Sequence, residues 1–258
     1  MSIVVSNKQK IHYELAGDKG PWMLLHPPHM IPMNAWKEGG YVKQLEEDFR
    51  LVLIEPLGQG YSDAPKDYSH YTISSRIRHI LDIMREVQAD YAYFLGMGLG
   101  AQVGFQMSKE FPRRIRSLIT AGAQPYQELE EAQFLKEKLD KLRSGNISAY
   151  LQQWHSLDHL TEGQEKVILQ GDTEAYALGL EASINWEGLG EDLQSLGTIT
   201  LLFTAKAESR FLSVRDAGKR MRYGRYMILP KVLYSHGLWS SELIIKPLLE
   251  FTRRDRSN

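Results

Sequence analysis

The chain has 258 residues, with 31 lysines and arginines against 32 aspartates and glutamates, and it contains no cysteine. The absence of thiols excludes disulfides, cysteine-ligated metal centres and a cysteine nucleophile. The formal net charge of −1 gives no global basic field for nucleic acid or anionic lipid. A composition of 43% hydrophobic and 24% charged residues, at this length, is typical of one larger globular α/β domain.

The N-terminal segment shows no targeting pattern. Only three consecutive apolar residues, at positions 3–5, precede polar ones, which is too few for the apolar region of a signal peptide. No stretch approaches the roughly 18 apolar residues that a membrane span requires. We therefore expect a cytoplasmic protein with neither a membrane nor a nucleic acid as its partner.

Short apolar runs alternate with longer helical patterns through the first half of the chain. Continuous apolar runs are typical of strands buried on both faces of a parallel sheet, whereas apolar residues at i, i+3, i+4 and i+7 indicate a helix. The predicted elements are strands at 22–26 and 50–55, a helix at 74–87, a strand at 91–95, a helix at 99–111 and a strand at 115–121. This order predicts a parallel, doubly wound sheet with right-handed crossovers.

The pattern changes between about residues 125 and 196. Glutamate and glutamine are dense there, helical periodicity dominates, and no strand-like run occurs. We interpret this block as a helical cap or lid inserted into a single domain that spans residues 1–258. The sheet pattern then resumes, with a strand at 198–204, a helix at 213–223, a strand at 225–232 and a closing helix at 241–253.

The segment from Gly96 to Gly100 carries the most informative motif. It lies between a predicted strand and a predicted helix, which is the position of a nucleophile elbow, G-x-S-x-G. In such an elbow a sharp turn exposes the central side chain above the sheet, so the residues two before and two after must be small. Gly96 and Gly100 meet this requirement, but the central residue is Gly98, which has no side chain.

With these features the chain resembles the α/β-hydrolase superfamily over nearly its whole length. Residues 55–65 are similar to the family's D-x-x-G-x-G-x-S-x-x-P loop, and His236-Gly237 precedes the last predicted helix. The resemblance implies an α/β-hydrolase fold, with a mostly parallel central sheet flanked by helices and a helical cap insertion. It also implies a small-molecule pocket that needs no cofactor.

The departures from the family pattern concern the reaction centre. Gly98 leaves the nucleophile position vacant, so the acyl-enzyme or alkyl-enzyme mechanism has no atom to start from. Glu208 stands at the family's acid position and His236 at that of its catalytic histidine. This dyad could act as a general base, with Glu208 orienting the imidazole. We interpret Ser62, on the family loop, as a structural hydroxyl rather than as a replacement nucleophile.

The expected oxyanion loop also departs from the family pattern. It reads His26-Pro27-Pro28-His29, and proline has no N–H group. If Pro28 holds the donor position, one of the two oxyanion donors is absent, whereas a one-residue shift would supply the N–H of His29. The other expected donor, the N–H of Leu99 after the elbow, is retained.

We expect the pocket to be lined by the loop, by the elbow and by aromatic residues of the insertion. His26 and His29 suit local pocket polarity better than a metal site, because no third ligand has convincing spacing. Met97 precedes the vacant position and is expected beside the ligand. The residues expected to line the cap side are Trp154, Trp186 and Phe134.

Three functional hypotheses follow from the sequence. The first is a ligand-binding protein without serine chemistry, or an atypical enzyme that uses the His236–Glu208 dyad, with a small and apolar organic ligand. The second is a serine hydrolase, esterase or lyase whose nucleophile was exchanged for Gly98 by engineering, although the drift at the acid and oxyanion positions argues against a single exchange. The third is a structural protein that binds a partner.

Overall fold

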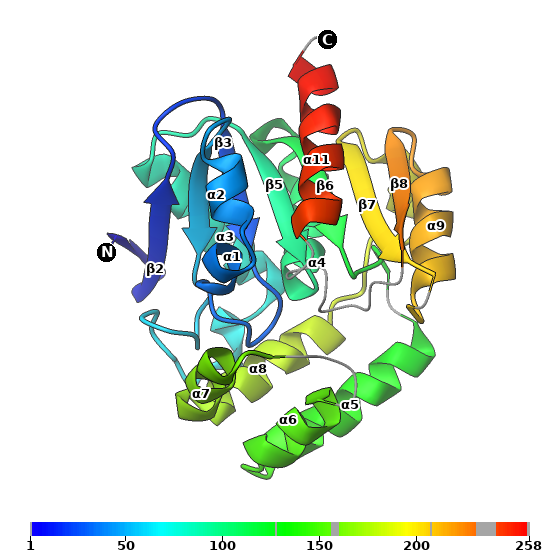
Figure 1. Cartoon of the computed structure of the whole chain (residues 1–258). Coiled ribbons are helices and arrows are strands. Elements are labelled where there is room, and N and C mark those ends of the chain that lie inside the picture. The colour runs from blue at the N-terminus through cyan, green and yellow to red at the C-terminus, as the bar shows by residue number, and fades with distance from the viewer. Residues whose placement is uncertain (1, 127, 156–159, 207, 231–240, 257–258) are drawn as a thin grey trace.

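The computed structural model describes residues 2–126, 128–155, 160–206, 208–230 and 241–256. Its centre is an eight-stranded sheet with the order β1-β2-β4-β3-β5-β6-β7-β8 (Figure 1). Strands β1 and β2 pair antiparallel, as do β2 and β4, while all later pairs are parallel. The strands are β1 (Ser2–Ser6), β2 (Gln9–Ala16), β3 (Trp22–His26), β4 (Arg50–Ile54), β5 (Ala92–Met97), β6 (Ile115–Ala121), β7 (Ile199–Ala205) and β8 (Gly224–Leu229).

Helices cover both faces of the sheet and create two apolar cores. Helices α3, α4 and α9 pack on one face, and α2 and α11 pack on the other. Four inserted helices, α5–α8, lie below the carboxyl ends of the parallel strands (Figure 1). The helices are α1 (Ala35–Glu38), α2 (Tyr41–Leu45), α3 (Ile73–Glu86), α4 (Leu99–Glu110), α5 (Leu129–Arg143), α6 (Ile147–His155), α7 (Glu162–Gln170), α8 (Thr173–Ile184), α9 (Phe211–Arg220) and α11 (Ser241–Arg256).

Local chemistry explains where helix α3 begins. Thr72 is its N-cap, and the Thr72 hydroxyl accepts a hydrogen bond from the Ser75 N–H at 3.2 Å. The predicted apolar stripe of this helix packs into the core, with Ile77, Ile80 and Met84 fully buried. The helix therefore has one face fixed against the sheet, and this face also carries the buried Arg76.

The structure confirms the α/β-hydrolase fold and the mostly parallel sheet. The strands predicted at 22–26 and 115–121 have the observed bounds, and helix α9 begins and ends two to three residues before the predicted 213–223. Strands β1 and β2 were not predicted, because this edge of the sheet is partly exposed and neither strand has more than three consecutive apolar residues. Between β6 and β7, the described residues contain helices and no strand.

Candidate functional site

The elbow has the backbone of a nucleophile turn without the nucleophile. Gly98 lies between β5 and α4 with φ 52° and ψ −118°, and its N–H donates to the Ala121 carbonyl at 3.2 Å. A Cβ at Gly96 would collide with the carbonyl of Gly100, and a Cβ at Gly100 would collide with the carbonyl of His26. The turn therefore closes only with these glycines, as the motif predicts.

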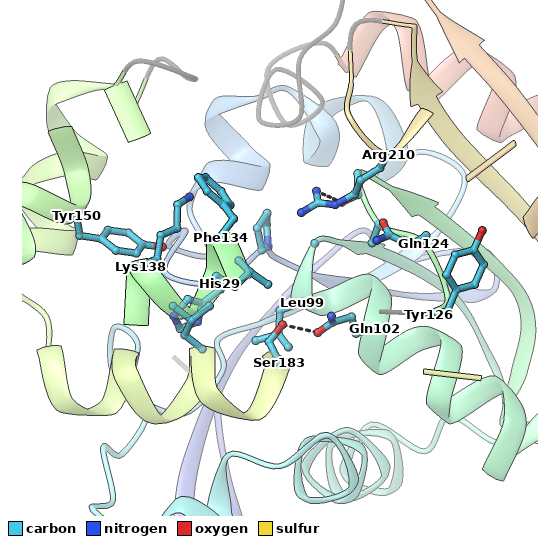
Figure 2. A pocket seen from close by; sticks show the side chains of 16 residues that line it. His29, Leu99, Gln102, Gln124, Tyr126, Phe134, Lys138, Tyr150, Ser183 and Arg210 are labelled. Carbon is cyan, nitrogen blue, oxygen red and sulfur yellow. Dashed lines mark hydrogen bonds between the residues drawn. The ribbon is translucent and has the colours of Figure 1, made fainter. Parts of the chain in front are cut away.

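A pocket of about 100 Å³ lies beside Gly98, between the sheet and the inserted helices (Figure 2). Its walls come from the loop after β3, the start of α4, the loop after β6, helices α5, α6 and α8, and the loop after β7. The lining residues are Pro28, His29, Gly98, Leu99, Gln102, Gly122, Ala123, Gln124, Tyr126, Phe134, Leu135, Lys138, Tyr150, Leu180, Ser183 and Arg210.

The polar part of the pocket lining carries positive charge. Lys138, on α5, places its ammonium group 4.5 Å from the centroid of the Phe134 ring and 5.5 Å from that of Tyr150. Arg210 approaches from the loop after β7, where its Nη1 donates to the Gly122 carbonyl at 3.1 Å. The lining contains two cationic side chains and no aspartate or glutamate among the described residues. The pocket is therefore suited to a ligand that carries an acidic or strongly polar group.

A buried hydrogen bond joins the elbow helix to the inserted helices. The Ser183 hydroxyl on α8 donates to Gln102 Oε1 on α4 at 2.6 Å (Figure 2). This bond fixes the position of α8 relative to the elbow helix α4. Both residues also line the pocket.

The oxyanion loop places Pro28 and His29 in the pocket wall. His26 lies deeper and does not line the pocket, because its carbonyl packs against Gly100 and its Nδ1 donates to the Pro27 carbonyl at 3.0 Å. Burial, followed by the charge of Arg76, lowers the pKa of both histidines to about 3, so they are neutral at pH 7. Backbone N–H groups of Leu99, at the first turn of α4, and of His29 are the candidate oxyanion donors.

Glu208 follows the carboxyl end of β7, as the resemblance implies for the acid. The Thr204 hydroxyl donates to Glu208 Oε2 at 3.1 Å, and the Glu208 N–H donates to the Ala205 carbonyl at 3.0 Å. Burial raises the pKa of the Glu208 carboxyl. His236, the other half of the expected dyad, lies outside the described residues.

The aromatic residues expected on the cap side lie in different places. Phe134 lines the pocket, but Trp186 lines a separate surface pocket, where its Nε1 donates to Gln106 Oε1 at 2.9 Å. The side chain of Trp154 lies outside the described part of the structure. Met97 does not line the pocket, and its side chain is buried in an apolar core.

The loop after β4 holds a second polar cluster, away from the pocket. His12 Nδ1 lies 2.7 Å from Glu55 Oε2, which also accepts the Tyr61 N–H at 2.7 Å. The Ser62 hydroxyl donates to the Glu55 carbonyl at 2.6 Å and accepts the His12 N–H at 2.9 Å. Gly60 has a positive φ, and a Cβ there would collide with the Glu55 carboxylate. These bonds tie the loop to β2.

Sequence reasoning missed the cations of the pocket. Lys138 lies within a run of charged helical residues, and Arg210 belongs to a loop. No motif or periodic pattern in the sequence therefore marks either residue as part of a site. A signal exists for Arg210, since it follows the acid position by two residues at the carboxyl edge of the sheet.

Neither a metal-ion cluster nor a membrane-spanning helix occurs among the described residues. Those residues contain no group of three histidines, cysteines, aspartates or glutamates placed to hold a metal ion. They also contain no helix whose length and apolar character would let it cross a membrane.

Comparisons with known proteins identify relatives of low identity. The putative 2-succinyl-6-hydroxy-2,4-cyclohexadiene-1-carboxylate synthase of Bacillus subtilis is 20% identical over 229 residues, which are 82% of this chain and 84% of that protein. A putative carbamate hydrolase, RutD, of Serratia proteamaculans is 23% identical over 147 residues, which are 55% of this chain and 53% of that protein.

Solved structures and a family profile agree with the fold. The enol-lactonase of Burkholderia xenovorans superposes with a TM-score of 0.86 at 18% identity, covering 98% of this chain and all of that one. A hydrolase of Pseudomonas aeruginosa gives a TM-score of 0.84 at 18% identity, covering 97% of each chain. The profile of the alpha/beta hydrolase fold matches residues 28–158, just over half of the chain. The chain therefore belongs to the alpha/beta hydrolase fold family.

Proposed function

We propose that the protein binds a small organic molecule in the pocket beside Gly98 and does not process it through an acyl-enzyme intermediate. The observation that carries this proposal is the elbow itself, whose backbone and pocket are retained around a residue without a side chain. Covalent catalysis at this position needs a hydroxyl, thiol or carboxylate, and glycine supplies none.

The pocket lining supports a ligand with two unlike parts. Leu99, Leu135 and Leu180 offer an apolar wall, which agrees with the apolar ligand expected from the sequence. Lys138 and Arg210 favour an acidic group on the same molecule, which extends that expectation. The name of the Bacillus relative, a carboxylate synthase, supports an organic acid as the ligand class.

Binding can be tested with the small aromatic sulfonate benzenesulfonate, followed by saturation-transfer NMR of its ring protons. Leu180→Trp should fill the pocket and remove saturable binding of this probe, because Leu180 is buried in the pocket wall. Leu169→Trp, at an exposed position on α7, is the matched control and should bind as the parent does. Equal binding by both variants would refute binding in this pocket.

Chemistry can be tested with p-nitrophenyl acetate and butyrate. Loss of triad function costs on the order of 10⁶ in kcat, so the parent should hydrolyse these esters about that much more slowly than a serine esterase does. Gly98→Ser is the informative gain-of-function variant, since turnover that disappears in Gly98→Ser/His236→Ala would demonstrate a working acid, base and oxyanion site.

General-base catalysis by the His236–Glu208 dyad is the second candidate function. It is favoured by the place of Glu208 after β7, two residues before the pocket-lining Arg210. Turnover of either ester by the parent, lost in both His236→Ala and Glu208→Gln, would support this candidate and refute a purely binding role.

A further inference from the structure

Strand β1 forms an open edge of the sheet. It stands first in the strand order and pairs with β2 on one side, and no described element lies beyond it (Figure 1). Its sequence, Ser-Ile-Val-Val-Ser, contains no charged residue and no proline, and its register with β2 has no bulge. Charges, prolines and bulges are the features that commonly keep an exposed edge strand from pairing with another chain. Strand β1 has none of them and is therefore open to pairing.

Two apolar side chains of β1 face solvent. Ile3 is 41% exposed and Val5 is 66% exposed, whereas Val4 between them is buried in the core beside helix α3. Successive side chains of a strand point to opposite faces, so Ile3 and Val5 share the face that α3 does not cover. On this face His12 is the β2 partner of Ile3, and the exposed Tyr61 ring packs edge-on against the His12 ring. The open edge therefore carries a small apolar surface.

The turn between β1 and β2 fixes the hydrogen-bond pattern of this edge. Asn7 and Lys8 form the turn and both have positive φ, at 46° and 64°, while Ser6 is paired with Gln9. Positive φ at both positions is typical of a two-residue hairpin turn of type I′. The residues that flank such a turn form a hydrogen-bonded pair, and hydrogen-bonded pairs alternate along the ladder with non-hydrogen-bonded ones. Ser6 therefore directs its N–H and C=O groups toward β2.

The same alternation assigns the other backbone groups of β1. Val4 and Ser2 lie at even spacing from Ser6, so they also form hydrogen-bonded pairs with β2. The N–H and C=O groups of Ile3 and Val5 therefore point away from β2, toward the open edge. No hydrogen bond joins these outward groups to another described residue.

The outward groups of β1 complement those of a second β1 strand that runs antiparallel to it. When Val4 lies opposite Val4 of the second copy, Ile3 lies opposite Val5 of that copy. The N–H and C=O groups of Ile3 then meet the C=O and N–H groups of Val5, as in a hydrogen-bonded pair of an antiparallel ladder. A two-fold axis repeats this exchange at the other end of the strand. Ser2 lies opposite Ser6, so each position meets a residue of similar size and polarity.

We propose that the protein self-associates through β1, with two copies paired antiparallel about Val4 to form one continuous sheet. Ile3 of each copy then packs against Val5 of the other, which removes exposed apolar surface from water. The same patch is used by both copies, as in most two-fold symmetric dimers. A five-residue strand gives a small interface, so we expect a weak dimer whose population depends on protein concentration.

This dimer is independent of the proposed function. Strands β2, β4 and β3 separate β1 from the elbow strand β5, and no residue of β1 or β2 lines the pocket beside Gly98. Pairing at β1 therefore leaves the pocket lining unchanged.

Disulfide cross-linking tests the register of the pair. The chain has no cysteine, so a single introduced cysteine can form a disulfide only between two copies. In the proposed pair, position 4 lies opposite itself, where the Cβ atoms of the two strands are about 4.5–5.5 Å apart. Val4→Cys should therefore give a disulfide-linked dimer on oxidation with diamide. Leu15→Cys, at a half-exposed position of β2 beyond the β1 pairing, is the control. Val4→Cys that cross-links no faster than Leu15→Cys would overturn the proposal.

Analytical ultracentrifugation tests the dimer without a cross-link. The mass of the parent should rise from that of one chain toward that of two as its concentration increases. Val5→Pro removes an outward N–H that the β1–β2 ladder does not use, and should weaken the dimer at least tenfold. Val5→Lys, which keeps the backbone and sets a charge on the edge, should weaken it as well. Leu15→Lys is the matched control and should dimerise as the parent does. A parent that stays monomeric at millimolar concentration would overturn the proposal.

Benzenesulfonate binding separates this inference from the proposed function. Val5→Lys should bind the probe as the parent does, because the pocket lies elsewhere. A parent that dimerises without binding the probe contradicts only the proposed function. A parent that binds the probe without dimerising contradicts only the inference about β1.

Discussion

The loop after β4 and the elbow after β5 are both motifs of this family, yet they differ in what they retain. In the loop, Glu55 and Ser62 form hydrogen bonds with His12 on β2 and with the loop backbone. At the elbow the backbone turn is kept, but the side chain that would react is absent. The hydrogen bonds that support the loop are present, while position 98 of the elbow carries no nucleophilic side chain.

The loop also shows why residue types alone do not make a catalytic site. It contains a serine, a histidine and an acid, but the Ser62 hydroxyl bonds to backbone groups and not to the His12 ring. A catalytic triad needs the hydroxyl on one imidazole nitrogen and the acid on the other. Ser62 therefore has the geometry of a structural hydroxyl, as its position in the sequence predicts.

Removing the centre of the loop cluster should have the largest effect on stability. Glu55→Ala leaves the Tyr61 N–H and the buried His12 ring without their acceptor. We expect the free energy of unfolding to fall by about 3–5 kcal/mol, as when one partner of a buried pair is deleted. Urea denaturation measures this change. Glu47→Ala, at an exposed position, should change it by less than about 0.5 kcal/mol, and equal effects would contradict the structural role of the loop.

A side chain added at the elbow should lower stability by a smaller amount. Gly98→Ser places an L-residue at φ 52° and ψ −118°, which should lower the free energy of unfolding by about 1–3 kcal/mol. The control is Gly145→Ser, where φ is 74° and no atom lies within 4 Å of the added Cβ. Urea denaturation should show the larger loss for Gly98→Ser. A stabilising effect at position 98 would show that the elbow is not strained.

The pH dependence of stability compares the loop cluster with a further buried histidine, His79 on α3. His12 has a carboxylate partner, whereas His79 faces the cation Arg76 and has its pKa lowered to about 3. In the unfolded chain His79 takes up a proton near pH 6.5, whereas in the folded protein it stays neutral. The free energy of unfolding therefore falls as the pH falls from about 6.5 toward 3. His79→Leu should reduce the loss of unfolding free energy between pH 6 and pH 5 by about 1 kcal/mol, as measured by urea denaturation at each pH. An unchanged slope would contradict the neutral state of His79.

The sequence predicted the parts of the fold that depend on local pattern. The central strands and the glycine spacing of the elbow follow from apolar runs and from sterics, so they were found without a structure. The cations Lys138 and Arg210 could not be found in this way, because residues far apart in the chain create the pocket. Trp186 shows the same limit, since an aromatic residue suits a pocket wall, but Trp186 lines a separate pocket and bonds to Gln106 on α4.

The central claim is that no covalent intermediate forms on this protein, and intact-protein mass spectrometry tests it directly. The parent should show no mass increase after incubation with an alkyl fluorophosphonate, which transfers its phosphonyl group to an activated serine hydroxyl with loss of fluoride. Gly98→Ser, which places a serine hydroxyl at the elbow, is the positive control for labelling there. A stoichiometric adduct on the parent, at Ser62 or at any other hydroxyl, would contradict the account.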